Sequence, residues 1–207
     1  MNALVRFAQH GLCVWLAFAG TTHDSNAAVG ERIADAALAQ VGVTTHYDPS
    51  YRRLDYPMGD VAPDTGVCAD VIVRALRGVD LDLQRELHRD MKAAFPAYPA
   101  LWGLSRPDHN IDHRRVPNLR RWFERQGWSR PQSSRSDDYL PGDIVSWRLD
   151  SGLAHIGIVT ARLAPGTHRP LLVHNIAFGA LAQDVLFAWE ITGHYRMPDR
   201  ANTTAGR

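Results

Sequence analysis

The residue pattern of this 207-residue chain changes character a little past its middle. Up to Gly127, apolar residues recur at intervals of three and four, which is the spacing of amphipathic helices. After Trp128, a polar connector leads into short β-rich runs separated by Gly, Pro, Asp and Ser, which is typical of strands. Helices followed by strands predict an α+β domain, with N-terminal helices packed on a C-terminal antiparallel β-sheet.

The expected elements follow from this spacing and from their start and stop signals. Helices are predicted over residues 30–43, 67–78, 81–95 and 117–127. Asp64 or Thr65 is the expected cap of the second helix, and Gly78 its expected end. The segment Thr44–Gly66 is rich in Pro, Gly, Asp and Tyr without a steady period, so we expect a long surface loop. Strands are predicted over residues 143–147, 155–163, 170–178 and 186–196.

The N-terminal residues have the pattern of a secretory signal peptide. Met1–Arg6 is short and basic, and the apolar run Gly11–Gly20 is too short to span a bilayer. Small residues follow, so cleavage is expected after Ala27 or Ala28, with a retained membrane anchor as the alternative. We therefore expect a signal peptide over 1–28, one domain over 29–198 and a disordered tail over 199–207. The mature protein is predicted to be periplasmic, without stable membrane insertion.

The overall composition excludes several classes of protein. A formal charge of +1, 22% charged residues and 45% hydrophobic residues argue against a nucleic-acid binder, a disordered chain or a membrane channel. The length fits one domain with a core of its own. We expect a monomer with no nucleic-acid partner and no cofactor.

The chain has two cysteines, and only one of them is expected in the mature protein. Cys13 lies in the predicted signal peptide, so an exported chain keeps only Cys68 and cannot form an internal disulfide. A single exported cysteine is a buried small hydrophobe, an intermolecular bridge or a reactive thiol. Cys68 is predicted at the start of a helix, whose positive end favours the thiolate. A nucleophilic cysteine also needs an imidazole from another element.

His155 is the candidate for that imidazole. It opens the strand "HIGIV", where alternation places His155 and Gly157 on one face of the sheet. The next strand, "LLVHNI", offers His174 and Asn175 as the group that orients the imidazole. Their side chains point to opposite faces, so only one of them can serve, and spacing leaves the choice open.

These residues resemble those of a known family. Cys68 at a helix start, together with "PGDIVSW", "HIGIV" and "VHN", is similar to the NlpC-type papain-like cysteine peptidases and amidases of bacterial cell walls. The resemblance implies Cys68 as nucleophile, His155 as base and His174 as the third member of a triad. A tyrosine about twelve residues before the cysteine commonly lines the oxyanion side in that family, and Tyr56 stands at that distance.

More of the chain resembles a narrower group. The strings "YDPSYRRLDYP", "GVCADVIVRAL", "HRDM", "NIDHRRVPNL" and "AWEITGHYR" are similar to an exported bacterial family catalogued as domain of unknown function 1287. This likeness covers nearly all of residues 30–197 and implies a papain-like fold without naming a substrate. The broader family usually reads Asp-Cys-Ser-Gly, whereas this chain has Asp70 on the far side of the thiol. Asp70 is therefore a candidate substrate contact, with a structural role as the alternative.

The stretch Asp108–Pro117 supplies further candidates for substrate binding, namely His113, Arg114 and Arg115. Paired arginines can hold a substrate carboxylate through bidentate contacts. The alternative is a self-satisfied loop in which Asp112 pairs with an arginine.

The leading interpretation is an exported cysteine hydrolase that cleaves an amide bond, in cell-wall peptides, through a thioester intermediate. A metallohydrolase using His109 and His113 with the neighbouring aspartates is a weaker alternative, because Pro117 interrupts the helix that would align them. No metal is assigned in the leading interpretation. The third possibility is a non-catalytic envelope binding module that keeps a papain-like shell.

Overall fold

A computed structural model describes residues 23–198, with side chains described from residue 28. It confirms the predicted α+β class, with helices preceding an antiparallel sheet. Within these residues, four α-helices form: α1 (His23–Leu38), α2 (Cys68–Arg77), α3 (Leu83–Ala94) and α4 (Val116–Arg125). Short 3-10 helices follow α3 (Phe95–Ala97), precede α4 (Asp112–Arg114) and precede the sheet (Ser136–Asp138).

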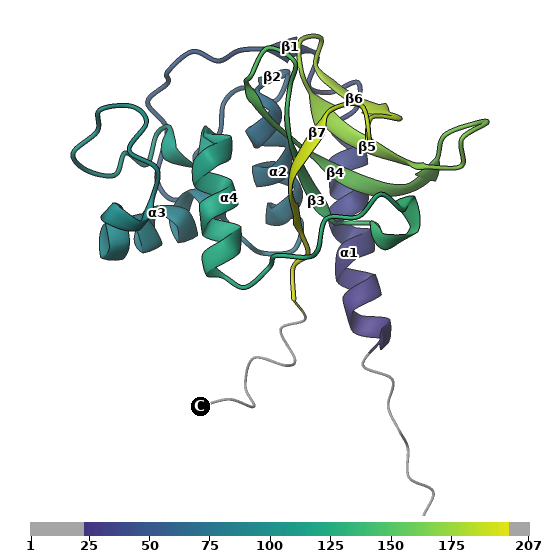
Figure 1. Cartoon of the computed structure of the whole chain (residues 1–207). Coiled ribbons are helices and arrows are strands. Elements are labelled where there is room, and N and C mark those ends of the chain that lie inside the picture. The colour runs from purple at the N-terminus through teal and green to yellow at the C-terminus, as the bar shows by residue number, and fades with distance from the viewer. Residues whose placement is uncertain (1–22, 199–207) are drawn as a thin grey trace, which may run out of the picture.

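The main sheet has five strands in the order β6-β5-β4-β3-β7, and every neighbouring pair is antiparallel. The strands are β3 (Ile144–Arg148), β4 (Ala154–Leu163), β5 (Pro170–Asn175), β6 (Ala180–Gln183) and β7 (Glu190–Tyr195). The central strand β4 therefore lies between β3 and β5. Figure 1 shows α3 and α4 at the side of the molecule away from this sheet, with α2 between.

Alternation along β4 divides the core between the two faces of the sheet. Ile156 and Ile158 belong to the larger cluster, which they share with Ile72 of α2. Val159 and Trp147 belong to a smaller cluster on the other face. Ile72, Ile156 and Ile158 are fully buried, so burial of β-branched residues holds α2 against the sheet despite their modest helix propensity.

Several local predictions are corrected. Val67, not Asp64 or Thr65, caps α2, and its N–H donates to Asp70 Oδ2 at 2.6 Å. Asp64 and Thr65 are unavailable as caps because Thr65–Gly66 forms β2, which pairs in parallel with β1 (His46–Tyr47) inside the predicted loop. The strand predicted over 170–178 ends at Asn175, and the chain turns back as β6.

The predicted signal peptide lies mostly outside the described residues. Because α1 begins at His23, cleavage after Ala27 or Ala28 would fall within its first turns. The buried residues Ile33 and Ala37 would remain in the shortened helix. None of the helices within residues 23–198 combines the length and apolar character needed to cross a membrane. The predicted tail, 199–207, also lies outside the described residues.

Candidate active site

Cys68 begins α2, as predicted, where its thiol faces the first residues of β4. The backbone N–H groups of Cys68, Ala69 and Ile156 are directed at the sulfur and favour its thiolate form. Ile156 directly follows His155, so the thiol lies beside the backbone that carries the candidate imidazole. Because the Cα atoms of consecutive residues are about 3.8 Å apart, the backbone of His155 lies close to the Ile156 amide that faces the thiol.

Burial nevertheless dominates the chemistry of the thiol. Cys68 is 6% exposed, and burial, reinforced by the negative charge of Asp70, raises the pKa of its thiol to about 12. Three amide groups and the helix end oppose this shift without reversing it. The resting side chain is therefore a neutral thiol at neutral pH.

His155 and His174 form a buried pair on neighbouring strands. His155 Nε2 and His174 Nδ1 are 2.9 Å apart, and the rings are nearly perpendicular at 81°. Burial, with a further contribution from His174, lowers the pKa of His155 to about 3, and burial also lowers the pKa of His174. One proton is shared between two neutral rings, so a proton on His155 Nε2 leaves Nδ1 of that ring as a free base.

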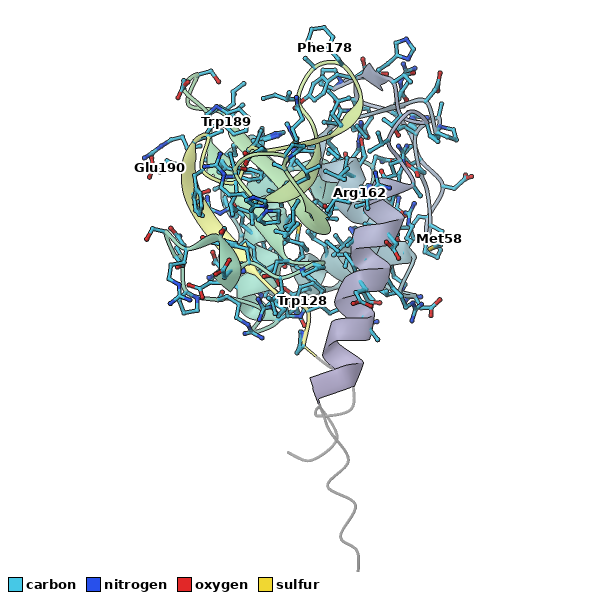
Figure 2. The ribbon with its side chains drawn as sticks, turned by 90° about the vertical axis from the view of Figure 1, so that its right-hand side faces the viewer. Met58, Trp128, Arg162, Phe178, Trp189 and Glu190 are labelled. Atoms are coloured by element: carbon cyan, nitrogen blue, oxygen red, sulfur yellow. The ribbon has the colours of Figure 1, made fainter. Side chains whose placement is uncertain are left out.

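Packing fixes the orientation of this pair. The Trp147 ring stacks on His155 at 5.7 Å, and Trp147 Nε1 donates to the carbonyl of Leu186 at 3.0 Å. Trp189, labelled in Figure 2, meets both imidazoles edge-on. Gly157 has no side chain, and a Cβ there would lie 3.1 Å from the Cβ of His174. The glycine thus allows the two strands to bring His155 and His174 together.

Asn175, the other candidate for the third position, has a different partner. Its Nδ2 donates to the carbonyl of Gly66 at 3.0 Å, two residues before Cys68. Alternation along β5 turns it away from the face that carries His174. The structure therefore brings His174 to His155, and Asn175 ties the end of β5 to the segment that positions the thiol.

A cavity of about 460 Å³ opens beside the thiol. Cys68 lines it together with Tyr47, Trp102 and Arg115, and Gly152–Ala154 forms another wall. Ala154 immediately precedes His155, so the cavity reaches the start of the strand that carries the candidate base. Cys68 thus borders a groove, although the residue itself is buried.

Tyr56 is placed away from this cavity, contrary to the role predicted for it. Its ring packs against His88 at 5.3 Å and His109 at 5.1 Å. The neighbouring Met58 and Gly59 bond to residues that begin α3, and Arg77 at the far end of α2 also bonds to Gly59. Chain spacing misplaced this tyrosine, since it lies by the C-terminal end of α2 and Cys68 by the N-terminal end.

Tyr47 stands at the thiol instead. Tyr47 pairs in parallel with Gly66, which lies two residues before Cys68. Tyr47 and Cys68 themselves are twenty-one residues apart in the sequence. Burial, then the nearby Cys68 and Asp70, raise the pKa of the Tyr47 phenol. No local sequence signal identifies it, because the two-residue strand pairing that places it is visible only in the fold.

Asp70 and Arg114 form a buried ion pair rather than a substrate contact. Arg114 NH2 lies 3.0 Å from Asp70 Oδ2, and both side chains are almost fully buried. Arg114 also donates to the carbonyls of Asp48 and Ser50. The donors of Arg114 are directed at groups of the protein itself, so the pair anchors the start of α2 to the loop that carries Tyr47.

Arg115 differs from its neighbour. Its guanidinium lies over the Trp102 ring at 4.1 Å, and NH1 contacts Asp112 Oδ1 at 3.1 Å. The pairing of Asp112 with an arginine, one of the two alternatives, is therefore observed. Arg115 nevertheless lines the cavity beside the thiol, and of its guanidinium only NH1 forms a hydrogen bond within the described residues.

His113 does not reach the cavity. It is buried, and burial together with the charges of Arg77 and Arg114 lowers its pKa to about 4. His109 instead packs with Tyr56, so the metal ligands of the alternative hypothesis point to different surroundings. Within the described residues, no three His, Cys, Asp or Glu side chains are grouped as a metal site would require.

Comparison with known proteins identifies the family. The model of a domain of unknown function (DUF1287) matches residues 34–197. The chain belongs to the DUF1287 family. Within it, the chain is 56% identical over 165 residues to the uncharacterized protein YijF of Escherichia coli (strain K12), a match that covers 79% of this chain and 80% of YijF. The family expected from the sequence strings is confirmed.

A solved structure, NlpC1 from Trichomonas vaginalis, is also similar to this DUF1287 chain. The two are 19% identical with a TM-score of 0.42, and the match covers 81% of this chain and 43% of NlpC1. The chain thus spans less than half the length of that protein. In the DUF1287 chain itself, a cysteine begins a helix packed on an antiparallel sheet and histidines stand on adjacent strands, which is the α+β arrangement expected.

Proposed function

We propose that this protein is an exported cysteine hydrolase that cleaves an amide bond in cell-wall peptides. Cys68 is the nucleophile, His155 the base and His174 the residue that positions the base. The observation that carries this proposal is the 2.9 Å contact between His155 Nε2 and His174 Nδ1, on the strand whose Ile156 amide faces the thiol.

The resting pair is neutral, so proton transfer accompanies attack. In this proposal His155 Nε2 stays engaged with His174, and Nδ1 accepts the proton of the Cys68 thiol. The transfer requires the imidazole to turn toward the sulfur from the face of β4 that it shares with Trp147. The sulfur forms a bond to the carbonyl carbon, and the carbonyl electrons move to its oxygen. Collapse of this intermediate breaks the carbon–nitrogen bond, and the leaving amine takes the proton from His155.

The second half of the reaction reverses these roles. Water attacks the thioester while His155 accepts a proton from it, and the carbon–sulfur bond then breaks. The thiol recovers its proton as the carboxylic acid leaves. His174 keeps the imidazole in one tautomer through both halves.

Two groups are proposed to stabilise the oxyanion. The Cys68 backbone N–H belongs to the first turn of α2, where amide groups lack helical acceptors and the helix dipole is positive. The Tyr47 phenol lines the same cavity and takes the role first predicted for Tyr56. Donors of this kind act when charge develops on the substrate oxygen.

The groove also suggests how substrate is held. Its described lining contains apolar residues, Tyr47, and the two arginines, of which Arg114 is paired with Asp70. Arg115, stacked on Trp102, is therefore the proposed contact for a substrate carboxylate. Peptides that carry such a carboxylate beside apolar side chains fit these walls.

Digestion of purified peptidoglycan sacculi tests this function. The protein is incubated with sacculi, and the released fragments are analysed by mass. Fragments that differ by one amide cleavage are expected, and their masses identify the bond. Sacculi that yield no fragments, and bind the protein with equal strength before and after changes at Cys68, would instead favour the binding-module interpretation. Cell fractionation for the processed chain tests export in parallel.

A further inference from the structure

A second pocket lies outside the proposed active site and is rich in cationic side chains. It encloses about 720 Å³ between α3 and the segments around Tyr51 and residues 104–110. Arg53, Lys92 and Arg106 line it, together with His88 and His109. We propose that this pocket binds a phosphate-type oxyanion, independently of the proposed hydrolase function.

The charge balance of the pocket supports an anionic ligand. The pocket is lined by three basic side chains, those of Arg53, Lys92 and Arg106, and by one carboxylate, that of Asp108. Within residues 28–198, Arg53, Lys92 and Arg106 form no ion pair with a carboxylate, whereas Arg74 and Arg125 elsewhere are paired with aspartates. Like charges gathered without counter-charges raise the local concentration of anions.

Asp108 does not neutralise these cations directly, because its oxygens are engaged by neutral groups. Oδ2 accepts from the Tyr51 hydroxyl at 3.0 Å, and Oδ1 accepts from the Asn110 backbone and side-chain amides at 2.9 and 2.8 Å. Burial would raise the pKa of Asp108, but these hydrogen bonds and the nearby His109 keep it below its usual value. The carboxylate therefore shapes the wall and leaves the cationic donors to a ligand.

The inner wall adds two imidazoles. The rings of His88 and His109 are 5.6 Å apart, and Tyr56 packs against both. His88 Nδ1 is buried and has no hydrogen-bond partner among the described residues. Burial, then the charges of His109 and Lys92, lower the pKa of His88. A bound oxyanion would supply the negative charge and the acceptors that these side chains lack.

The position of the pocket relates it to the groove at Cys68. Leu101 lines that groove and Leu104 lines this pocket, so one short loop separates the two. A ligand held here would lie across this loop from the thiol. The chemistry fits a free phosphate, a phosphate carried by an envelope polymer, or a lipid headgroup, since all present several acceptors to arginine and lysine.

Histidine ring resonances in NMR spectra test the pocket directly. The protein, purified after expression of the full chain, is titrated with sodium phosphate at constant ionic strength. Saturable shifts of the His88 and His109 rings are expected. The double variant Lys92→Gln/Arg106→Gln should weaken binding by about tenfold or more, the loss typical of charge-assisted hydrogen bonds. Arg162→Gln, on the exposed end of β4 at the face shown in Figure 2, is the matched control and should bind like the unaltered protein.

Two results would contradict phosphate binding in this pocket. Shifts that do not saturate, or equal weakening by Arg162→Gln and by the double variant, would show general charge screening and overturn the proposal. Sedimentation with phosphatidylglycerol vesicles, compared with phosphatidylcholine vesicles, then separates the sources. Co-sedimentation lost in the double variant assigns a lipid headgroup, whereas phosphate binding without co-sedimentation assigns a soluble or polymer-borne phosphate.

Discussion

His155 Nε2 lies 2.9 Å from His174 Nδ1, in a contact between β4 and β5 that is closed to solvent. Two histidines so placed cannot both be protonated without bringing like charges together in a desolvated site. The contact therefore determines which histidine tautomer is available for proton transfer. It also determines how the stability of the fold depends on pH.

Stability should fall as the pH drops below the ordinary histidine pKa. The pKa values of His155, about 3, and His113, about 4, are depressed in the fold, and burial also lowers that of His174. From about one pH unit above the ordinary histidine pKa of about 6.5, all three are neutral in both states and their contribution is complete. Between pH 6.5 and 5 the unfolded chain binds protons that the folded chain does not bind. The free energy of unfolding therefore falls by up to about 1.4 kcal/mol per pH unit for each histidine.

Urea unfolding at pH 7, 6 and 5 measures this effect. The midpoint should move to lower urea at each step, and His113→Gln should show a shallower dependence on pH than the unaltered protein. Equal midpoints at pH 7 and pH 5 would contradict neutral burial of these imidazoles.

The thiol should react slowly with alkylating reagents at neutral pH. A pKa near 12, raised first by burial, leaves only a small thiolate fraction at pH 7, and that fraction rises about tenfold per pH unit. Intact-mass measurements of iodoacetamide addition between pH 6 and 9 follow the rate at Cys68 in the processed chain. Rapid alkylation that is independent of pH in this range would indicate a resting thiolate–imidazolium pair instead.

Substitutions at Tyr47 and Tyr56 should have different effects on catalysis. Tyr47→Phe removes the phenol beside the thiol and is expected to lower kcat about 10² to 10³-fold, the range for loss of one oxyanion donor. Tyr56→Phe, in the His88 and His109 cluster, should leave kcat unchanged. Rates of fragment release from sacculi give both values, and equal losses in the two variants would remove Tyr47 from the proposed oxyanion site.

Arg114 and Arg115 should have opposite effects despite their adjacency. Arg114→Leu leaves the buried Asp70 carboxylate without its partner and should lower the free energy of unfolding by about 3 to 5 kcal/mol. Arg115→Leu, at the groove, should raise KM for carboxylate-bearing peptides. It should cost less stability than Arg114→Leu, because the buried Asp112 keeps its hydrogen bond from the Asp108 amide. Denaturant unfolding and steady-state kinetics on both variants separate the roles, and a stability loss in Arg115→Leu as large as in Arg114→Leu, with KM unchanged, would contradict its assignment as a groove residue.

These contrasts show where sequence reasoning succeeds. Periodic apolar residues predict the helices and the order of helix and strand, because burial on one face imposes that spacing. The start of α2 at Cys68 and the opening of β4 near His155 also follow from local pattern. Alternation narrows the third position to His174 or Asn175, and only the pairing of the strands brings His174 to His155.

The remaining site depends on contacts between distant segments. Tyr47 reaches the thiol through a two-residue parallel pairing with Gly66, which no periodicity can reveal. Arg114 turns inward to Asp70 and Arg115 stacks on Trp102, although the two arginines are neighbours of the same chemical type. The family resemblance selected Tyr56 by its distance from Cys68 along the chain, and the course of the loop along α2 places that residue at the opposite end of the helix.

The central claim, that Cys68 is a nucleophile and not a packing residue, is tested most directly with Cys68→Ala. Sacculi are incubated with this variant and with the unaltered protein, and both the bound protein and the released fragments are quantified. The account predicts that Cys68→Ala binds sacculi as the unaltered protein does and releases no fragments. Release of the same fragments at the same rate by Cys68→Ala would contradict it.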